Sequence, residues 1–327
     1  MKIIAFIGDS HTFGEGVGGE FFFSPKVVAG DLRKLPFNTP GYVNLIRDYY
    51  SLTTNSKAKD YSEESLTRLF DKTYEQCGVV TNEFKISERF SLCRIFFRAQ
   101  TEKATAQIQL NGKCVKTLEL ITNDDSYSKN IRVANVFSGD GESPQELKII
   151  CADGKQVLVE RMEFYSGDYA IINCGFGSCP IGKLMDVYFD DYVADLNPYA
   201  AVIECCTIND WLTKDTLDVY KANLESAVGK IKSITQKTFM HTVFPISENQ
   251  VSADGNNVYD DYIDCTRQVA KEYNIPLADC NKTMREYLEI IPEERKNGVM
   301  YHDKWHPNAL GHIMYAKDII ELIKNEI

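Results

Sequence analysis

Short, mostly apolar runs, each followed by turn residues, constrain the fold of this chain more than any other feature. The first run lies within residues 2–7, and three others cover 169–174, 200–206 and 239–244. Runs of this kind are typical of strands that are buried on both faces of a parallel sheet. The sequence therefore predicts strands at these four places, and a short last strand at 276–279.

Segments with helical spacing lie between these runs. Apolar residues recur at intervals of three and four in 41–50, 218–234, 259–273 and 308–323, and Pro307 precedes the last of them. Buried strands that alternate with amphipathic helices predict a doubly wound α/β layer. In open sheets of this class, ligands bind beyond the carboxyl ends of the strands.

The interval 56–165 breaks this alternation. It contains segments that alternate apolar and polar residues, separated by turn residues such as Asn111-Gly112: 105–110, 115–120, 146–151 and 157–164. Strands joined by polar turns without helices are typical of an antiparallel sandwich. We therefore predict an α/β domain made of 1–55 and 166–327, with an all-β sandwich of 56–165 inserted into it.

The composition excludes several classes of partner. The formal net charge is −11 and no block of Lys or Arg stands out, so neither nucleic acid nor a membrane surface is an expected partner. No stretch approaches the ~20 apolar residues of a membrane span, and the first apolar run is too short for a signal peptide. The ten cysteines are scattered, without a Cys-x-x-Cys pair. We therefore expect reduced thiols and a cytoplasmic protein.

A serine follows the first predicted strand, in the turn Gly8-Asp9-Ser10. At the carboxyl end of a strand in an open α/β sheet, a serine on a tight glycine turn is placed as an exposed nucleophile. Gly-Asp-Ser is also a common surface turn, so this segment alone does not establish a function.

A base and an acid for this serine lie near the other end of the chain. Asp303 and His306 are three residues apart, ahead of the last predicted helix. This spacing lets the carboxylate hold one imidazole nitrogen while the other faces outward, which is what a serine nucleophile requires. A histidine near a helix cap is the structural alternative. His302 adds a metal-binding pattern, but Pro307 disfavours helical ligand geometry, and we expect neither a metal nor an organic cofactor.

Two further strand ends carry groups that could stabilise an oxyanion. The side-chain amide of Asn209, within 207–210, can donate to developing negative charge. The glycines of 173–179 let backbone N–H groups approach a ligand closely. Each segment is also compatible with ordinary turn chemistry.

The order of these segments resembles the SGNH (GDSL) hydrolase family. The first block of that family corresponds to Gly8-Asp9-Ser10, the third to 207–210 and the last, Asp-x-x-His, to 303–306. Thr207 departs from the customary glycine, and the second block falls at Gly177 or Ser178. The resemblance implies a flavodoxin-like sheet and the following site: a triad of Ser10, His306 and Asp303, and an oxyanion hole of Ser10, Asn209 and Gly177 or Ser178.

The inserted segment is similar, more loosely, to the jelly-roll modules that accompany SGNH carbohydrate esterases. This similarity implies a carbohydrate-binding-like sandwich and a sugar-containing substrate. The predicted function is hydrolysis of a small acyl ester, acetyl by preference, on a carbohydrate or sugar-containing metabolite. A sugar O-acyltransferase with the same triad and an inactive glycan-binding protein are the alternatives. The residues expected to contact substrate are His11, Asp210 and Trp305.

Gly14, Gly16 and Gly19 match the Gly-x-Gly-x-x-Gly pattern of dinucleotide sites. That pattern should follow the strand directly and open a helix, whereas here several residues intervene and no helical pattern follows. We therefore expect these glycines to form a loop beside the site and not a cofactor site.

Overall fold

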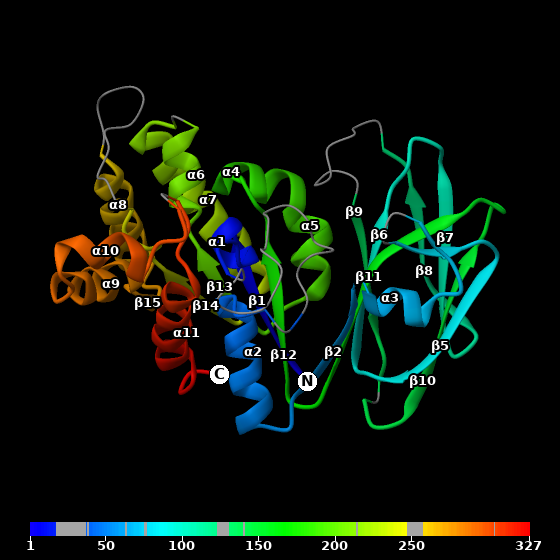
Figure 1. Ribbon diagram of the computed structural model, residues 1–327. Helices are drawn as coiled ribbons and strands as arrows, with labels where there is room; N and C mark the ends of the chain where they lie inside the picture. The colour runs from blue at the N-terminus through cyan, green and yellow to red at the C-terminus, as the bar shows by residue number, and fades with distance from the viewer. Residues whose placement is uncertain are drawn as a thin grey trace. The chain divides into compact units, whose positions relative to one another are not determined.

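The computed structural model describes residues 1–17, 37, 39–62, 64–74, 77–122, 131–139, 141–213, 215–246, 258–303 and 305–327. Gly19 lies outside the described residues. The chain divides into two compact units (Figure 1). One comprises Lys2–Gly30, Asn38–Asp48 and Ile171–Ile327, and the other comprises Met1, Asp31–Phe37 and Tyr49–Ala170. The predicted domain boundaries, at 55/56 and 165/166, stay a prediction.

A five-stranded sheet organises the first unit. Its strands are β1 (Lys2–Gly8), β12 (Tyr169–Gly175), β13 (Ala200–Glu204), β14 (Lys237–His241) and β15 (Leu277–Ala278), in the order β12-β1-β13-β14-β15. The pairs from β1 to β15 are parallel, and the Phe176 N–H donates to the Gly8 carbonyl where β12 and β1 both end. Along the chain this is the 2-1-3-4-5 order of flavodoxin-like sheets. The predicted α/β class with a parallel sheet is confirmed.

Burial explains why these short runs form strands. Residues 4–7 of β1 and all of β13 are buried, as expected for strands covered on both faces. The helices that accompany the sheet bury one apolar stripe each, such as Leu224, Val228 and Ile231 of the longest helix. These helical segments are α1 (Ser10–Phe13), α2 (Tyr42–Thr53), α4 (Ile181–Lys183), η3 (Leu184–Tyr188), α5 (Phe189–Tyr192), η4 (Ala194–Leu196), α6 (Thr207–Leu212), α7 (Leu217–Ile234), α8 (Tyr259–Glu272), α9 (Cys280–Glu289), α10 (Glu293–Val299) and α11 (Ala309–Ile323).

The second unit consists mainly of two antiparallel sheets that share one hydrophobic core. At Asn111-Gly112 both residues have left-handed backbone, with φ of 50° and 80°, and the paired strands on either side form the predicted hairpin. One sheet is β5 (Glu83–Arg89), β10 (Pro144–Cys151), β7 (Ala104–Leu110) and β8 (Lys113–Leu120), in that order. The other is β3 (Thr73–Tyr74), β4 (Cys77–Val80), β11 (Val157–Ser166), β6 (Leu92–Arg98) and β9 (Ile131–Phe137), with β2 (Lys57–Ser62) paired to β11. A jelly-roll topology stays a prediction.

Two details differ from the sequence-based expectation. A short helix, α3 (Glu64–Leu69), lies inside the interval expected to contain no helices. Cys205 and Cys206 lie beyond the end of β13 and not within it, because Cys206 adopts a left-handed backbone (φ 51°) that ends the strand and caps α6.

The described helices include none with the length and apolar content needed to cross a membrane. All ten cysteines are free thiols, and Cys114 is the exposed one.

Candidate active site

The nucleophile turn, residues 8–13, begins where β1 ends. Asp9 caps α1, since its Oδ1 accepts the His11 N–H at 2.9 Å, and Ser10 is the first residue of that helix. Gly8 has no room for a side chain: a Cβ there would lie within 2.3 Å of Thr12 Oγ1 and Glu204 Oε2. Close packing beneath the turn therefore requires Gly8, and the cap is supplied by Asp9.

The base loop, residues 300–308, is organised around one carboxylate. Asp303 Oδ1 accepts the N–H groups of Trp305 (2.7 Å) and His306 (2.8 Å), and both Asp303 oxygens lie 3.0 Å from His306 Nδ1. Asn308 then caps α11 by accepting from Leu310 N. A carboxylate only accepts hydrogen bonds, so Nδ1 carries a proton and Nε2 of the neutral ring is left as a proton acceptor.

The fold brings these two segments together. His306 Nε2 lies 3.0 Å from Ser10 Oγ, across 296 positions of sequence. The three predicted triad residues thus form a continuous chain of contacts, Asp303 to His306 to Ser10, with the geometry that general-base activation of a hydroxyl needs. Burial and the charge of the neighbouring His11 lower the pKa of His306 to about 4, although Asp303 acts to raise it. At neutral pH the ring is therefore unprotonated and able to accept the Ser10 proton.

Asn209 also lies at this site. It belongs to α6, directly beyond β13, and its Nδ2 donates to Asp9 Oδ2 at 2.5 Å. An amide NH₂ has two hydrogens, so one remains for a ligand. On the other side of Ser10, Ser178 has a left-handed backbone (φ 54°) in the turn after β12. Of the two predicted positions, Ser178 lines the cavity described next.

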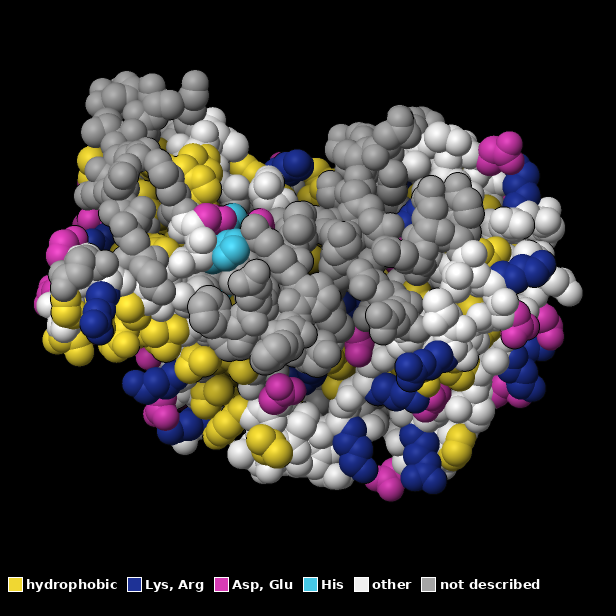
Figure 2. Space-filling view, viewed as in Figure 1, with side chains coloured by type: hydrophobic (Ala, Val, Ile, Leu, Met, Phe, Trp, Pro, Cys, Tyr) yellow, Lys and Arg dark blue, Asp and Glu magenta, His cyan; other side chains and the backbone are white. Residues whose placement is uncertain are grey.

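A cavity of about 310 Å³ opens beside Ser10. Its size is at the lower end of the range for small-molecule sites, ~300–1,000 Å³. Exposed histidine and acidic side chains lie next to one another on one face of the molecule (Figure 2). The lining combines a polar floor with apolar walls: Ser10, Glu15, Ser178, Ile208, Asn209, Leu212, Trp305 and His306.

Buried charged groups lie directly beneath the nucleophile turn. Glu204 accepts from Asp9 N (2.7 Å) and Cys206 N (2.9 Å), and His11 Nδ1 lies 4.0 Å from its Oε1. Burial alone would raise the pKa of Glu204, but the interaction with His11 lowers it to about 2. Burial alone would lower the pKa of His11, but the charge of Asp9 and the contact with Glu204 raise it to about 9. We infer a buried imidazolium–carboxylate pair under Ser10.

Asp9, Glu204 and Cys206 place two carboxylates and a thiol within 4.8 Å of one another. Each of the four carboxylate oxygens already accepts a protein N–H, from His11, Asn209, Cys206 or Asp9. The group therefore behaves as a hydrogen-bonded cluster. Its carboxylate oxygens are engaged by protein N–H groups and are not arranged to bind a metal ion.

Two predicted substrate contacts are not at the cavity surface. His11 and Asp210 are fully buried, whereas Trp305 lines the cavity. His11 Nε2 lies 2.7 Å from the Trp305 carbonyl, and Asp210 accepts the Ile181 N–H at 2.9 Å. The side chains of His11 and Asp210 therefore face protein groups, which argues against direct contact with a substrate.

Sequence reasoning missed several residues of the site. Glu204 could have been recognised from the sequence, because it is a lone carboxylate in an otherwise apolar strand and a buried carboxylate requires hydrogen-bond or charged partners. Glu15 and Leu212 line the cavity but belong to no spaced motif, and Ile208 lies in the 207–210 block without a predicted role of its own, so their place at the cavity depends on tertiary structure.

Comparison with known proteins supports the motif-based resemblance. The GDSL-like Lipase/Acylhydrolase family matches residues 152–313. The chain carries a GDSL-like acylhydrolase domain. The match includes Asn209, Asp303 and His306, and the nucleophile turn lies outside it. This domain makes the protein a hydrolase of ester bonds, and it confirms the resemblance to SGNH (GDSL) hydrolases.

Solved structures show more distant similarity to this GDSL-like protein. The acetylxylan esterase Axe2 from Geobacillus stearothermophilus is 21% identical over 47% of this chain and 72% of its own, with a TM-score of 0.40. A variant of that esterase is 24% identical over 49% of this chain and 74% of its own, with a TM-score of 0.41. LAE5, an alpha/beta hydrolase from the metagenome of Lake Arreo, Spain, is 21% identical over 47% and 72%, with a TM-score of 0.40. No curated protein matches the chain.

Proposed function

We propose that the protein is a serine esterase that removes a small acyl group, acetyl by preference, from a carbohydrate or sugar-containing metabolite. The observation that carries this proposal is the 3.0 Å approach of His306 Nε2 to Ser10 Oγ, with Asp303 against the other ring nitrogen. A serine, a neutral imidazole and an orienting carboxylate are the groups that acyl transfer through a covalent intermediate requires.

The proposed reaction proceeds in two halves. Ser10 Oγ bonds to the carbonyl carbon as its proton passes to His306 Nε2, and the carbonyl oxygen becomes an oxyanion. The tetrahedral intermediate collapses, the ester C–O bond breaks, and the leaving alcohol takes the proton from Nε2. Water then attacks the acyl-enzyme with His306 again as base, which releases the acid and restores Ser10.

Three donors are proposed for the oxyanion: the Ser10 N–H, the N–H of Gly177 or Ser178, and the Asn209 amide. Ser178 is favoured for the second position because it lines the cavity beside Ser10. The second hydrogen of Asn209 Nδ2 is available for this purpose while the first bonds to Asp9. Such donors act on charge that develops in the transition state and are among the largest contributions to catalysis.

The cavity walls support a small acyl group and a sugar alcohol. Ile208 and Leu212 are apolar and close to Ser10, and a cavity of about 310 Å³ has little room for a long acyl chain. Trp305 lies at the same cavity, next to Trp211 at a ring-centroid distance of 5.8 Å. An indole face of this kind can pack against the apolar face of a sugar ring.

The direct test is hydrolysis of p-nitrophenyl acetate and of a panel of acetylated sugars. Wild-type protein should release acetate, and Ser10→Ala should lower the rate to background with an unchanged melting temperature. Acetate release is measured with and without an added sugar acceptor, so that transfer to a hydroxyl is separated from hydrolysis. Equal rates for wild type and Ser10→Ala would show that the proposal is wrong.

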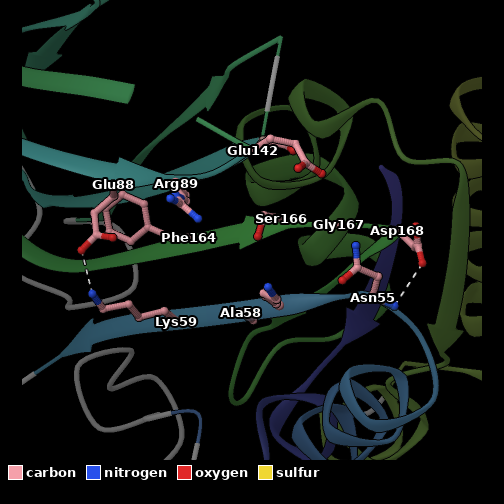
Figure 3. A pocket seen from close by; sticks show the side chains of 13 residues that line it. Asn55, Ala58, Lys59, Glu88, Arg89, Glu142, Phe164, Ser166, Gly167 and Asp168 are labelled. Atoms are coloured by element: carbon pink, nitrogen blue, oxygen red, sulfur yellow. Dashed lines mark hydrogen bonds and ion pairs between the residues drawn. The ribbon is translucent and has the colours of Figure 1, made fainter. Parts of the chain in front are cut away.

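For the antiparallel unit we propose the role of an accessory carbohydrate-binding domain. It contains a cavity of about 440 Å³ whose charged and polar residues come from β2, β5, β11 and neighbouring turns (Figure 3). Lys59 pairs with Glu88, and Asp168 accepts the Asn55 N–H, so the lining offers both hydrogen-bond donors and acceptors. Sugar hydroxyls both donate and accept, and such a lining suits them.

Calorimetric titration with neutral and acidic oligosaccharides tests this second role. Ser10→Ala is used to prevent turnover, and it is compared with the double variant Ser10→Ala/Arg89→Ala, since Arg89 lines the cavity. Binding that weakens several-fold in the double variant supports the proposal. Equal binding by both proteins contradicts it.

A further inference from the structure

The side chain that follows the candidate nucleophile has an unusual environment. His11 is fully buried, and each of its ring nitrogens faces groups that only accept hydrogen bonds. Nε2 lies 2.7 Å from the Trp305 carbonyl oxygen. Nδ1 makes no hydrogen bond, but it lies within ion-pair range of two carboxyl groups, 3.4 Å from Asp9 Oδ1 and 4.0 Å from Glu204 Oε1. Carbonyl and carboxylate oxygens both match an N–H, so the ring form that fits this environment carries a proton on each nitrogen.

The Trp305 carbonyl is a specific attachment point. Trp305 directly precedes His306, and it belongs to the base loop, whereas His11 belongs to the nucleophile turn. Two backbone hydrogen bonds close the base loop: His302 N donates to the His306 carbonyl at 2.9 Å, and Asn308 N to the Met300 carbonyl at 2.7 Å. The bond from His11 therefore ties the loop to the turn at the residue next to the base.

The charged ring also lies close to the base. The His11 and His306 ring centroids are 5.5 Å apart, with an interplanar angle of 64°. A cation at this position opposes the addition of a proton to His306. The other groups that face His306 are Asp303 at Nδ1, Glu15 at 3.4 Å from Nε2, and His302.

The groups around His11 itself come from several elements. Asp9 precedes it, Glu204 ends β13, His241 ends β14, and Tyr315 belongs to α11. Burial lowers the pKa of His241 to about 4 and raises that of Tyr315 well above its usual range, so both are neutral near pH 7. Burial and the charge of Glu204 raise the pKa of Asp9 well above its usual range, so Glu204 carries the charge that balances His11.

We propose that His11 is a positioning residue whose imidazolium, held by Asp9 and Glu204, fixes the base loop through the Trp305 carbonyl and keeps His306 unprotonated. The inference rests on the proposed function, in which Ser10 and His306 are nucleophile and base. In this arrangement, the buried charges beneath the turn help to set the distance between Ser10 and His306 and the protonation state of His306.

The test compares pH profiles of kcat/KM for p-nitrophenyl acetate in wild type, His11→Gln and His11→Leu. Glutamine can still donate to Trp305 but has no charge, so kcat should fall less than about 10-fold while the acid limb moves up by about one pH unit. Leucine removes charge and donor, and kcat should fall by about 10- to 100-fold. His312→Gln, at a buried neutral histidine, is the control and should leave the acid limb at its wild-type pH.

A second measurement reads the protonation state of His11 directly. Nitrogen NMR of the wild-type histidine side chains at pH 7 should reveal one imidazolium with both nitrogens protonated, absent from His11→Gln. A neutral His11 in wild type would overturn the proposal, as would a folded His11→Gln with an unchanged acid limb. If wild type and Ser10→Ala hydrolyse esters equally, the proposed function itself is wrong. If activity depends on Ser10 and only the His11 results are negative, this inference alone is wrong.

Discussion

The nucleophile turn is held from beneath by buried charge, whereas the base loop is held by one half-exposed carboxylate. Beneath Ser10, the side chains of Asp9, His11 and Glu204 are inaccessible to solvent. The Asp303 side chain is 42% exposed, and it orients His306 through bonds within its own loop. The position of the nucleophile is thus tied to the stability of the domain, while the orientation of the base depends on a local motif.

The largest effect that would test this comparison is that of Asp303→Asn. An amide in place of the carboxylate permits the wrong imidazole tautomer and removes the charge that stabilises the imidazolium, so kcat should fall by roughly 10³- to 10⁴-fold. Thermal unfolding should change little, because the side chain is at the surface. Asp186→Asn, at another exposed carboxylate, is the control for kcat. A large loss of stability in Asp303→Asn would show that the base loop also supports the fold.

Asn209→Ala tests whether a residue at the edge of the buried cluster acts on the transition state. Loss of an oxyanion donor should lower kcat by about 10²- to 10³-fold with little change in KM. Steady-state kinetics on p-nitrophenyl acetate would measure both constants. An unchanged kcat would restrict Asn209 to its structural bond with Asp9.

Glu204→Gln should affect stability first. It leaves His11 and Asp9 buried without their charged partner, and breaking such a pair costs about 3 kcal/mol in the free energy of unfolding. Urea denaturation would measure the loss, with Glu225→Gln on α7 as a partly exposed control. A cost no larger than that of the control would contradict the claim that buried charge holds the nucleophile turn.

The smallest expected effect is the pH dependence of stability. The pKa of His11 is raised from 6.5 to about 9, so its contribution is complete below pH 6.5 and is lost as pH rises through about 9. The pKa of Glu204 is lowered from 4.5 to about 2, so its contribution is present above pH 4.5 and is lost as pH falls toward 2. The pair should stabilise the protein most between pH 4.5 and 6.5. Unfolding free energies should decline above that window in wild type and less steeply in His11→Gln.

The contrast between a local motif and long-range contacts also explains which features could be predicted from the sequence. The Asp303–His306 pair is a local motif, so its geometry follows from three-residue spacing. The strands that carry Ser10 and Asn209 were predicted from apolar runs, and the sheet order places their carboxyl ends next to each other. The doubly wound α/β class could be predicted because short buried strands and helices alternate so regularly, whereas the flavodoxin-like order was implied by the resemblance to SGNH hydrolases.

The rest depends on contacts between distant residues. His11 follows the nucleophile in sequence, and a position near Ser10 suggested contact with substrate. Its orientation is instead decided by Glu204 and the Trp305 carbonyl, which are far away along the chain. The strands β6 and β9 were missed because they are buried along most of their length and do not alternate, whereas the regular alternation of β5 could have predicted it.

The account's central claim is that Ser10 becomes acylated. Mass spectrometry of the protein quenched in acid during turnover of p-nitrophenyl acetate, followed by peptide mapping, measures this directly. The account predicts one added acetyl group on the peptide that contains Ser10, absent from Ser10→Ala. The variant His306→Ala slows turnover and so gives the adduct time to accumulate. Turnover by this variant without an acetyl group on Ser10 would contradict the account, as would an acetyl group on another residue such as Cys114.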